Sequence, residues 1–296
     1  TQVKYLIQNL RANVQTVNTY EHAEVEPFLK SLKKIATYRA YSPMNLAKML
    51  DQIRPDIIHF YHSHTMYNAL KRINFKPKIY EVVHNRMGFG GDSTSYGKEF
   101  THVAVCVSPD AEKYFKSKIP TFPTTVIPNG VDTNTFAVRP PKPRGARLVG
   151  GFTGRLEGGW GKGVPDIIEI VKDLPIDFEL VGTDYGGFKK QIQDRGIKNI
   201  KVLPYSPNPE EAYKRWDFFL SMSPAEGFGL SIAEAVMMHI PTVLLNCGGV
   251  CHYLEDHVSA LIGDTPEDVR HRLWQLINDE VSLDQSQVDL SAVRMA

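Results

Sequence analysis

Short apolar segments rich in β-branched residues alternate with helical segments along most of the chain. In the first half, the strand candidates are DIIHFYH, KIYEVVH and VAVCVS, and helical patterns such as NLAKMLDQI and DAEKYFKSK lie between them. In the second half, RLVGGFTG, IDFELVG, NIKVLP, DFFLSMS and IPTVLLN alternate with helices in the same way. Strands that alternate with helices pair in parallel through βαβ crossovers. The sequence therefore predicts an α/β fold with two doubly wound, Rossmann-like parallel sheets.

A proline-rich segment, RPPKPRG at residues 139–145, separates the two halves. Its prolines can continue neither a helix nor a central strand. A chain of 296 residues with 42% hydrophobic residues can fill two cores. We therefore predict an N-terminal domain over residues 1–140, a C-terminal domain over 141–275 and a tail over 276–296. Ligands of such sheets bind at the carboxyl ends of the strands, so a cleft between the two domains is the expected site.

The composition favours a soluble protein of a reducing compartment. No apolar run reaches the roughly 18 residues of a membrane-spanning helix, and the N-terminus lacks the layout of a signal peptide. Cys106, Cys247 and Cys251 are odd in number and lie among apolar residues, which indicates buried thiols rather than a disulfide framework. We expect a cytoplasmic protein without a nucleic-acid partner.

Charge is divided unevenly between the halves. Residues 1–145 contain 20 Lys and Arg against 11 Asp and Glu, or +9, whereas residues 146–296 contain 14 against 22, or −8. One interpretation is that the first half meets something anionic, such as an acidic acceptor or a membrane surface. The alternative, two solvated surfaces of compensating charge, is equally open.

The stretch SPAEGFGLSIAEAVMMHIPTV, residues 223–243, carries the clearest sign of a ligand. Gly227 and Gly229 are costly inside a helix, so they indicate a sharp turn, and the helix is expected to begin near Leu230. The backbone N–H groups from Phe228 to Leu230 are then unpaired donors at the positive end of a helix dipole, which is a natural seat for phosphate.

Two carboxylates flank this predicted phosphate seat. Glu226 lies in the turn, and Glu234 lies about one helical turn beyond the helix start, on the face near Leu230. Carboxylates beside a phosphate are best explained if they bind hydroxyl groups. A nucleotide sugar offers that set of groups, because it combines a ribose diol, a diphosphate and sugar hydroxyls.

In this setting the E-x7-E spacing resembles the signature of the retaining GT-B glycosyltransferases called family 4. Further motifs follow in the family's order over roughly residues 40–265: PDIIHFYH (55–62), VVHNRM (82–87), VAVCVSP (103–109), VIPNGVDTNTF (126–136), GFTGRLEGGWGKG (151–163), VGTDYG (181–186) and NCGGVCHYLEDH (246–257). Each motif is weak alone, and their number and order make the resemblance specific.

The resemblance implies a role for five residues. Arg155 and Lys162 would hold the donor diphosphate in place of a metal ion. Glu226 would contact sugar hydroxyls near the reacting carbon, and Glu234 would hold the ribose hydroxyls. His84, which ends the strand KIYEVVH, would lie near the transferred sugar or the acceptor.

Other motifs are read as structural. His59, His62 and His64 invite a metal interpretation, but His59 belongs to a strand and no acid follows at ligand spacing, so we expect no zinc. Asn129-Gly130 is expected to form a tight turn, with a ligand contact left open. No Asp-x-Asp occurs in the sequence, which agrees with a route that needs no metal.

The chain also departs from the family pattern. Family members carry a Gly-Gly loop after the first strand, whereas the corresponding segment VQTVNTYEHAEVEPFLKSL contains no glycine. Trp160 lies between the two cations, and the chain is short for the family. These departures concern the acceptor side more than the donor side.

The resemblance implies a retaining, metal-independent glycosyltransferase (EC 2.4, a hexosyltransferase) that needs no cofactor besides its nucleotide-sugar donor. The acceptor would be a carbohydrate, a lipid-linked compound or another hydroxyl compound, with an anionic acceptor and peripheral membrane contact as hypotheses. One alternative is an inactive nucleotide-sugar-binding protein of the same fold. A Rossmann oxidoreductase is a second, but no G-x-G-x-x-G opens a helix after a strand.

Overall fold

The structure is a computed structural model that describes residues 16–18, 37–39, 42–61, 64–84, 99–140, 142–143, 145, 147–159, 161–283, 285 and 294–295. The chain divides into two compact units, Thr1–Pro128 and Asn129–Ala296. Each unit is built on a parallel sheet flanked by helices. The predicted α/β fold with two parallel-sheet units is therefore confirmed.

The first unit contains a four-stranded parallel sheet in the order β3-β4-β5-β6. Its strands are β3 (Ile57–Tyr61), β4 (Lys78–Val83), β5 (Val103–Cys106) and β6 (Thr124–Val126), and its helices are α3 (Pro43–Ile53), α4 (His64–Leu70) and α6 (Pro109–Lys118). A separate parallel pair joins β1 (Thr16–Asn18) to β2 (Thr37–Arg39).

Local sequence signals fix where the helices of the first unit begin. The Ser108 side chain accepts a hydrogen bond from the N–H of Ala111, and Pro109 occupies the first helical position of α6. Ser42 caps α3 in the same way. Serine caps followed by proline satisfy donors that a helix start leaves open. The helix start predicted at Ser108-Pro109 is confirmed.

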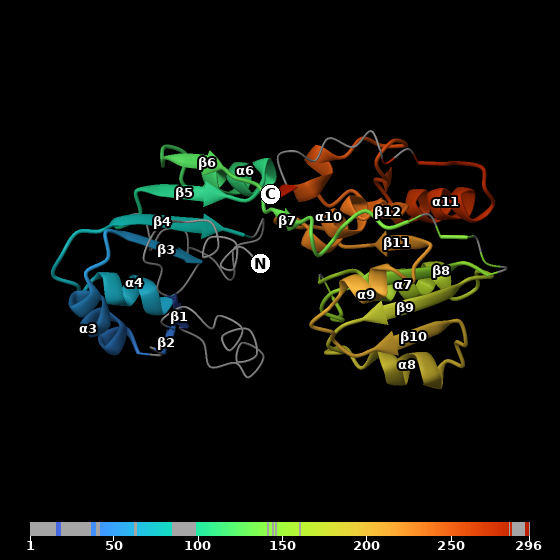
Figure 1. Cartoon of the computed structure of the whole chain (residues 1–296), viewed down its shortest axis with the longest axis horizontal. Coiled ribbons are helices and arrows are strands. Elements are labelled where there is room, and N and C mark those ends of the chain that lie inside the picture. The colour runs from blue at the N-terminus through green and yellow to red at the C-terminus, as the bar shows by residue number, and fades with distance from the viewer. Residues whose placement is uncertain are drawn as a thin grey trace. The chain divides into compact units, whose positions relative to one another are not determined.

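The second unit contains a six-stranded parallel sheet in the order β10-β9-β8-β11-β12-β13 (Figure 1). Its strands are β8 (Val149–Thr153), β9 (Asp177–Val181), β10 (Ile200–Leu203), β11 (Phe218–Ser221), β12 (Thr242–Leu245) and β13 (Leu261–Gly263). The helices are α7 (Val164–Val171), α8 (Phe188–Asp194), α9 (Glu210–Tyr213), α10 (Leu230–Met237), the 3-10 helix η2 (Gly249–Tyr253) and α11 (Pro266–Ile277).

The strand order shows where this sheet changes direction. From β8 the chain proceeds outward through β9 to β10, and then returns so that β11 pairs with the other side of β8. The connections after β8 and β11 lead to neighbouring strands on opposite sides of this point, β9 and β12. Such a topological switch point leaves a crevice beyond the carboxyl ends of the two strands. The loops after β8 and β11 are therefore the expected positions of binding residues.

The segment before the second sheet packs with the second unit. Strand β7 (Val131–Asp132) pairs in parallel with β14 (Arg294–Met295). The Arg139 guanidinium donates to the Trp216 carbonyl at 2.6 Å, and Lys142 forms an ion pair with Asp217. Packing thus divides the chain between residues 128 and 129, before the proline-rich segment, which belongs to the second unit. The domain bounds drawn from the sequence stay predictions.

Two local predictions need correction or refinement. Asn129-Gly130 forms no turn, because it leads directly into β7, and the turn lies at residues 133–136 where Asp132 accepts hydrogen bonds from the N–H groups of Asn134 and Thr135. None of the three cysteines forms a disulfide, but only Cys106 and Cys247 are buried, whereas Cys251 is partly exposed. Within the described residues, no helix combines the length and apolar character needed to span a bilayer.

Candidate functional site

The loop after β8 and the loop after β11 meet through an ion pair. Lys162, in the first loop, donates through its Nζ atom to both carboxylate oxygens of Glu226, in the second, at 2.6 and 2.9 Å. The Lys162 side chain is 26% exposed and that of Glu226 is 12% exposed. Lys162 and Glu226 therefore lie together at the switch point. Both side chains are mostly buried, and a small part of each remains accessible to solvent.

Backbone packing brings the two loops this close. Gly163, the N-cap of α7, has φ 67°, and a Cβ atom at this position would lie 2.0 Å from the carbonyl oxygen of Met222. Only glycine combines this backbone conformation with so close an approach to another chain segment. Gly163 thus holds the loop against the end of β11, and the neighbouring Lys162 is delivered to Glu226.

Arg155 lies apart from this pair. Its side chain is 61% exposed and forms an ion pair with Glu157 at 3.3 Å. An exposed pair of this kind contributes little to stability, so its guanidinium is free to change partners. The structure therefore brings Lys162, but not Arg155, into contact with Glu226.

The turn before α10 has the form that the sequence predicted. Gly229 is the N-cap of α10 with φ 95°, and the helix begins at Leu230. The N–H of Glu226 donates to the Cys247 carbonyl at 3.0 Å, and the Phe228 carbonyl accepts from Val250 at 2.6 Å. These two hydrogen bonds anchor the turn to the segment that follows β12.

The start of α10 presents unused donors. Among the described residues, the N–H groups of Phe228, Gly229 and Leu230 have no hydrogen-bond acceptor, and no side chain caps the helix. Phe228 is buried, whereas Leu230 is 37% exposed, so the row of donors reaches the surface. Unpaired donors at a helix start carry partial positive charge and bind anions.

Glu234 has different surroundings from Glu226. It lies one turn inside α10, and its Oε2 atom accepts a hydrogen bond from the Tyr213 hydroxyl at 3.0 Å. Tyr213 ends α9, and its hydroxyl also lies 2.8 Å from the Ser231 carbonyl oxygen. The Tyr213 hydroxyl thus holds Glu234.

The enclosure of Glu234 changes its acidity. Burial raises the pKa of the Glu234 carboxyl group to about 7, against the smaller lowering effect of the Tyr213 hydrogen bond. Burial, with the Glu234 charge beside it, also raises the pKa of Tyr213 well above its ordinary value. Glu234 is therefore balanced between its acid and carboxylate forms near neutral pH, while Tyr213 stays a hydrogen-bond donor.

His84 lies in the first unit, directly after β4. Its side chain is half-buried, and burial together with the nearby His59 lowers the pKa of the imidazole. The ring is consequently neutral at physiological pH and can both donate and accept a hydrogen bond. His84 is thus placed at the carboxyl edge of its own sheet, while its role near a sugar or an acceptor stays a prediction.

The expectation that His59, His62 and His64 bind no zinc stays a prediction. His59 lies on β3, which agrees with its expected place in a strand. His62 lies outside the described residues, and the side chain of His64 is likewise not described. Among the side chains that are described, no three of His, Cys, Asp or Glu gather as a metal site.

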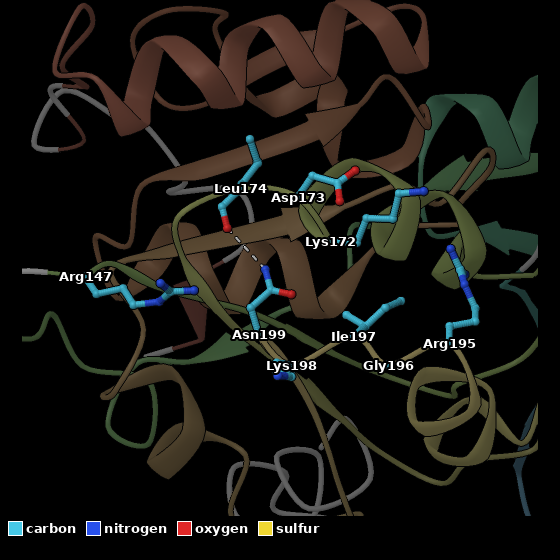
Figure 2. A pocket seen from close by; sticks show the side chains of 9 residues that line it. All are labelled: Arg147, Lys172, Asp173, Leu174, Arg195, Gly196, Ile197, Lys198 and Asn199. Carbon is cyan, nitrogen blue, oxygen red and sulfur yellow. Dashed lines mark hydrogen bonds between the residues drawn. The ribbon is translucent and has the colours of Figure 1, made fainter.

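A cavity of about 480 Å³ lies at the opposite, amino edge of the second sheet (Figure 2). Three of its cations already have partners: Lys172 and Arg195 both pair with Glu169, and Arg147 pairs with Asp177. The Asn199 amide donates to the Leu174 carbonyl, as the dashed line in Figure 2 shows. The sequence did not predict this cavity, and three of its four cations are paired within the protein, whereas Lys198 is exposed.

Sequence reasoning missed Tyr213 as part of the site. The segment PEEAYKRW predicted a helix, but nothing in it indicated that its tyrosine would hold a carboxylate 21 residues further on. A buried tyrosine is common in any core, and this one is distinguished only by the hydrogen bonds from its hydroxyl to Ser231 and Glu234 of α10. Trp160 lies outside the described residues, as does most of the glycine-free N-terminal segment.

Comparison with known families gives two matches. Residues 141–291, just over half of the chain, match the family described as glycosyl transferases group 1. Residues 9–135 match the family described as Glycosyltransferase Family 4.

Individual relatives are more distant. An uncharacterized glycosyltransferase of Methanocaldococcus jannaschii, MJ1178, is 28% identical over 127 residues, which cover 40% of this chain and 36% of that protein. The poly(glycerol-phosphate) alpha-glucosyltransferase of Bacillus subtilis is 35% identical over 78 residues, covering 25% of this chain and 12% of that protein. The matched region thus spans about a third and an eighth of these relatives.

The fold is shared more widely than the sequence. The structure of Anabaena Alr3699/HepE in complex with UDP and glucose superposes with a TM-score of 0.79 at 16% identity, and the match covers 98% of this chain and 89% of that one. At this level of identity the similarity concerns the fold of the two units.

Proposed function

The chain belongs to the glycosyl transferases group 1 family and has the GT-B architecture, and from this premise we propose that it transfers a sugar from a nucleotide-diphosphate sugar to a hydroxyl acceptor. In this proposal the reaction retains the configuration of the sugar and needs no metal ion. Donor binding is assigned to the second unit. The acceptor is assigned to the first.

The observation that carries the proposal is the pairing of Lys162 with Glu226 beside the open start of α10. A diphosphate needs several donors and positive charge, and this edge supplies three N–H groups, the helix dipole and an ammonium group. Two of the three Lys162 protons point to Glu226, which leaves one for a phosphate oxygen. Lys162 can therefore join the diphosphate to the carboxylate that we assign to the sugar.

The proposed chemistry follows from where charge develops. As the glycosidic bond breaks, negative charge grows on the leaving diphosphate and positive charge grows on the sugar ring. Lys162, the α10 N–H groups and Arg155, once released from Glu157, would stabilise the first, and the Glu226 carboxylate would stabilise the second. The acceptor would attack from the face that the nucleotide leaves, and a donor phosphate oxygen would take its proton. His84 is proposed to hydrogen-bond the sugar or the acceptor.

An anionic acceptor is the preferred hypothesis for the first unit. The +9 balance of residues 1–145 motivates it, and the relative from Bacillus subtilis is named for a poly(glycerol-phosphate) substrate. Opposite charge speeds encounter, and the gain falls as salt shortens the screening length to about 8 Å at 0.15 M. An acceptor KM that stays constant between low and high salt would contradict this part.

The alternative is a protein that binds the nucleotide sugar without transferring it. The segment VQTVNTYEHAEVEPFLKSL favours it, because it lacks the glycines expected beside the donor phosphates. Binding without turnover in the presence of a range of acceptors would support this alternative.

The proposal is tested in two steps. Thermal shift with the UDP, GDP and ADP forms of common sugars identifies the donor, since a ligand at 100 times its dissociation constant adds about 2.7 kcal/mol. UDP sugars come first, because the Anabaena structure holds UDP. Transfer is then measured with EDTA in excess, and we expect activity to persist. Activity lost to EDTA and restored by Mg²⁺ or Mn²⁺ would overturn metal independence.

A further inference from the structure

Tyr213 is a buried polar group whose hydroxyl serves the second glutamate of the site. The side chain is 0% exposed, and its oxygen lies 3.0 Å from Glu234 Oε2 and 2.8 Å from the Ser231 carbonyl oxygen. Both acceptors belong to α10, whereas Tyr213 ends α9. The hydroxyl therefore ties the helix that carries Glu234 to a separate element.

The ring of Tyr213 has little freedom to move. It packs edge-on against Trp216 and Phe136, with ring centroids 5.1 and 5.9 Å apart, and it also contacts Phe219 of β11. Trp216 is itself fixed, because its Nε1 atom donates to Glu179 at 2.9 Å. A well-packed aromatic core holds each ring in one orientation. The hydroxyl is consequently a fixed point toward which the Glu234 carboxyl group must orient.

The hydroxyl has one proton for two acceptors. That proton is shared between the Ser231 carbonyl and the Oε2 atom of Glu234. Because the hydroxyl contacts only Oε2, the other oxygen of Glu234 is left for a ligand. A carboxylate held by one oxygen presents the second in a set direction. This arrangement suits the recognition of a diol, whose hydroxyl groups need acceptors in fixed positions.

We propose that Tyr213 is a positioning residue that orients the Glu234 carboxyl group toward the ribose hydroxyls of the bound nucleotide. The inference rests on the proposed function, because it assumes that Glu234 binds a ribose. Tyr213 itself touches no ligand in this proposal. Its contribution is to limit the orientations of Glu234 before the nucleotide arrives.

The test compares two ligands in the Tyr213→Phe variant. Calorimetry measures the affinity of the full chain for UDP and for 2′,3′-dideoxy-UDP, which lacks the ribose hydroxyls, or for the corresponding GDP or ADP pair if the parent binds that nucleotide. We expect UDP to bind about tenfold more weakly to the variant, from the loss of a hydrogen bond to a charged group, and the dideoxy analogue to bind within twofold of the parent. Partial unfolding would weaken both ligands equally, so it cannot produce this change in their ratio.

Two further variants sharpen the result. Tyr114→Phe removes a partly exposed hydroxyl from α6 of the first unit, and should change neither affinity. In the double variant Tyr213→Phe with Glu234→Gln, the loss should be smaller than the sum of the two single losses, because one residue acts through the other.

The outcomes distinguish a failure of the role inferred for Tyr213 from a failure of the proposed function. A parent protein that binds none of the three nucleotides overturns the proposed function. A parent that binds UDP and its dideoxy analogue equally overturns the role of Glu234, and the inference with it. A parent that prefers UDP, together with a Tyr213→Phe variant that keeps the same preference, overturns the inference alone.

Discussion

The two edges of the six-stranded sheet in the second unit both carry cations, but the cations have different electrostatic surroundings. At the amino edge, Lys172 and Arg195 occupy the C-caps of α7 and α8 and share the Glu169 carboxylate. At the carboxyl edge, Lys162 lies just before the N-terminus of α7 and pairs with Glu226 across two loops. Helix C-termini carry partial negative charge and helix N-termini carry partial positive charge.

Under the proposed function, this difference favours the carboxyl edge as the site of the diphosphate. Cations at the amino edge compensate for helix C-termini and nearby acids, so little positive charge is left over. At the carboxyl edge the cation adds to the field of helix starts, and the α10 N–H groups lack acceptors among the described residues. The position of a cation relative to helix ends is therefore more informative than the number of cations around a cavity (Figure 2).

The largest effect is expected from Glu226→Gln at the carboxyl edge. The substitution removes the negative charge that stabilises the sugar as it becomes positive, so kcat should fall on the order of 100-fold. The affinity for the bare nucleotide diphosphate should stay near that of the parent, because Lys162 is released from its ion pair. Kinetics and calorimetry on the same preparation measure both. Glu267→Gln, on the exposed first turn of α11, is the control.

Lys162→Ala should produce the next largest effect. It removes a charge-assisted hydrogen bond to the leaving diphosphate, worth roughly 1.5–3 kcal/mol, or about 10- to 150-fold in kcat/KM. It also leaves Glu226 without its partner, which adds repulsion toward the diphosphate. Unchanged donor turnover in this variant would show that the diphosphate binds elsewhere than the carboxyl edge.

Acidification should weaken nucleotide binding through Glu234. Since burial raises the pKa of its carboxyl group to about 7, the carboxylate form dominates at pH 8 and the acid form at pH 6. A carboxylate accepts two hydrogen bonds from a diol, whereas the acid has lost part of that capacity. Affinity should fall about tenfold from pH 8 to pH 6, as expected for one proton with this pKa.

The Glu234→Gln variant isolates this contribution. It should bind the nucleotide more weakly at pH 8 and lose this part of the pH dependence, while the titration of the nucleotide's own phosphates remains in both proteins. A variant with the same slope as the parent would assign the pH dependence to another group.

The fold was largely predictable because its signals are local. The Ser108-Pro109 cap, the glycine turn before Leu230 and the buried strand β11 each depend on a few neighbouring residues. Strand order was not predictable in this way. The pairing of β7 with β14 joins residues about 160 positions apart in the chain, and no feature of either dipeptide-length strand specifies the other.

The sequence could propose the members of the site, whose ligand roles stay predictions, but it could not predict the contacts between them. Lys162 and Glu226 were expected near one diphosphate, but their ion pair depends on the backbone contact of Gly163 with Met222. That contact joins segments almost 60 residues apart. The hydrogen bond from Tyr213 to Glu234 likewise joins two separate helices, α9 and α10. A spacing pattern describes residues within one segment of the chain. It cannot predict these contacts, because the two partners of each contact lie on different segments.

The smallest effect is expected at the amino edge, where Lys198→Ala removes an exposed cation that lines the cavity of Figure 2. Lys198 follows the end of α8, and the neighbouring Lys172 and Arg195 are already paired with Glu169. Removing one solvated charge there should change nucleotide affinity and kcat by less than twofold and stability by less than about 0.5 kcal/mol. Because Lys162→Ala makes the same chemical change at the other edge, the two variants form a matched pair. Equal losses of nucleotide affinity in both would mean that total charge, rather than the helix starts of the carboxyl edge, attracts the diphosphate.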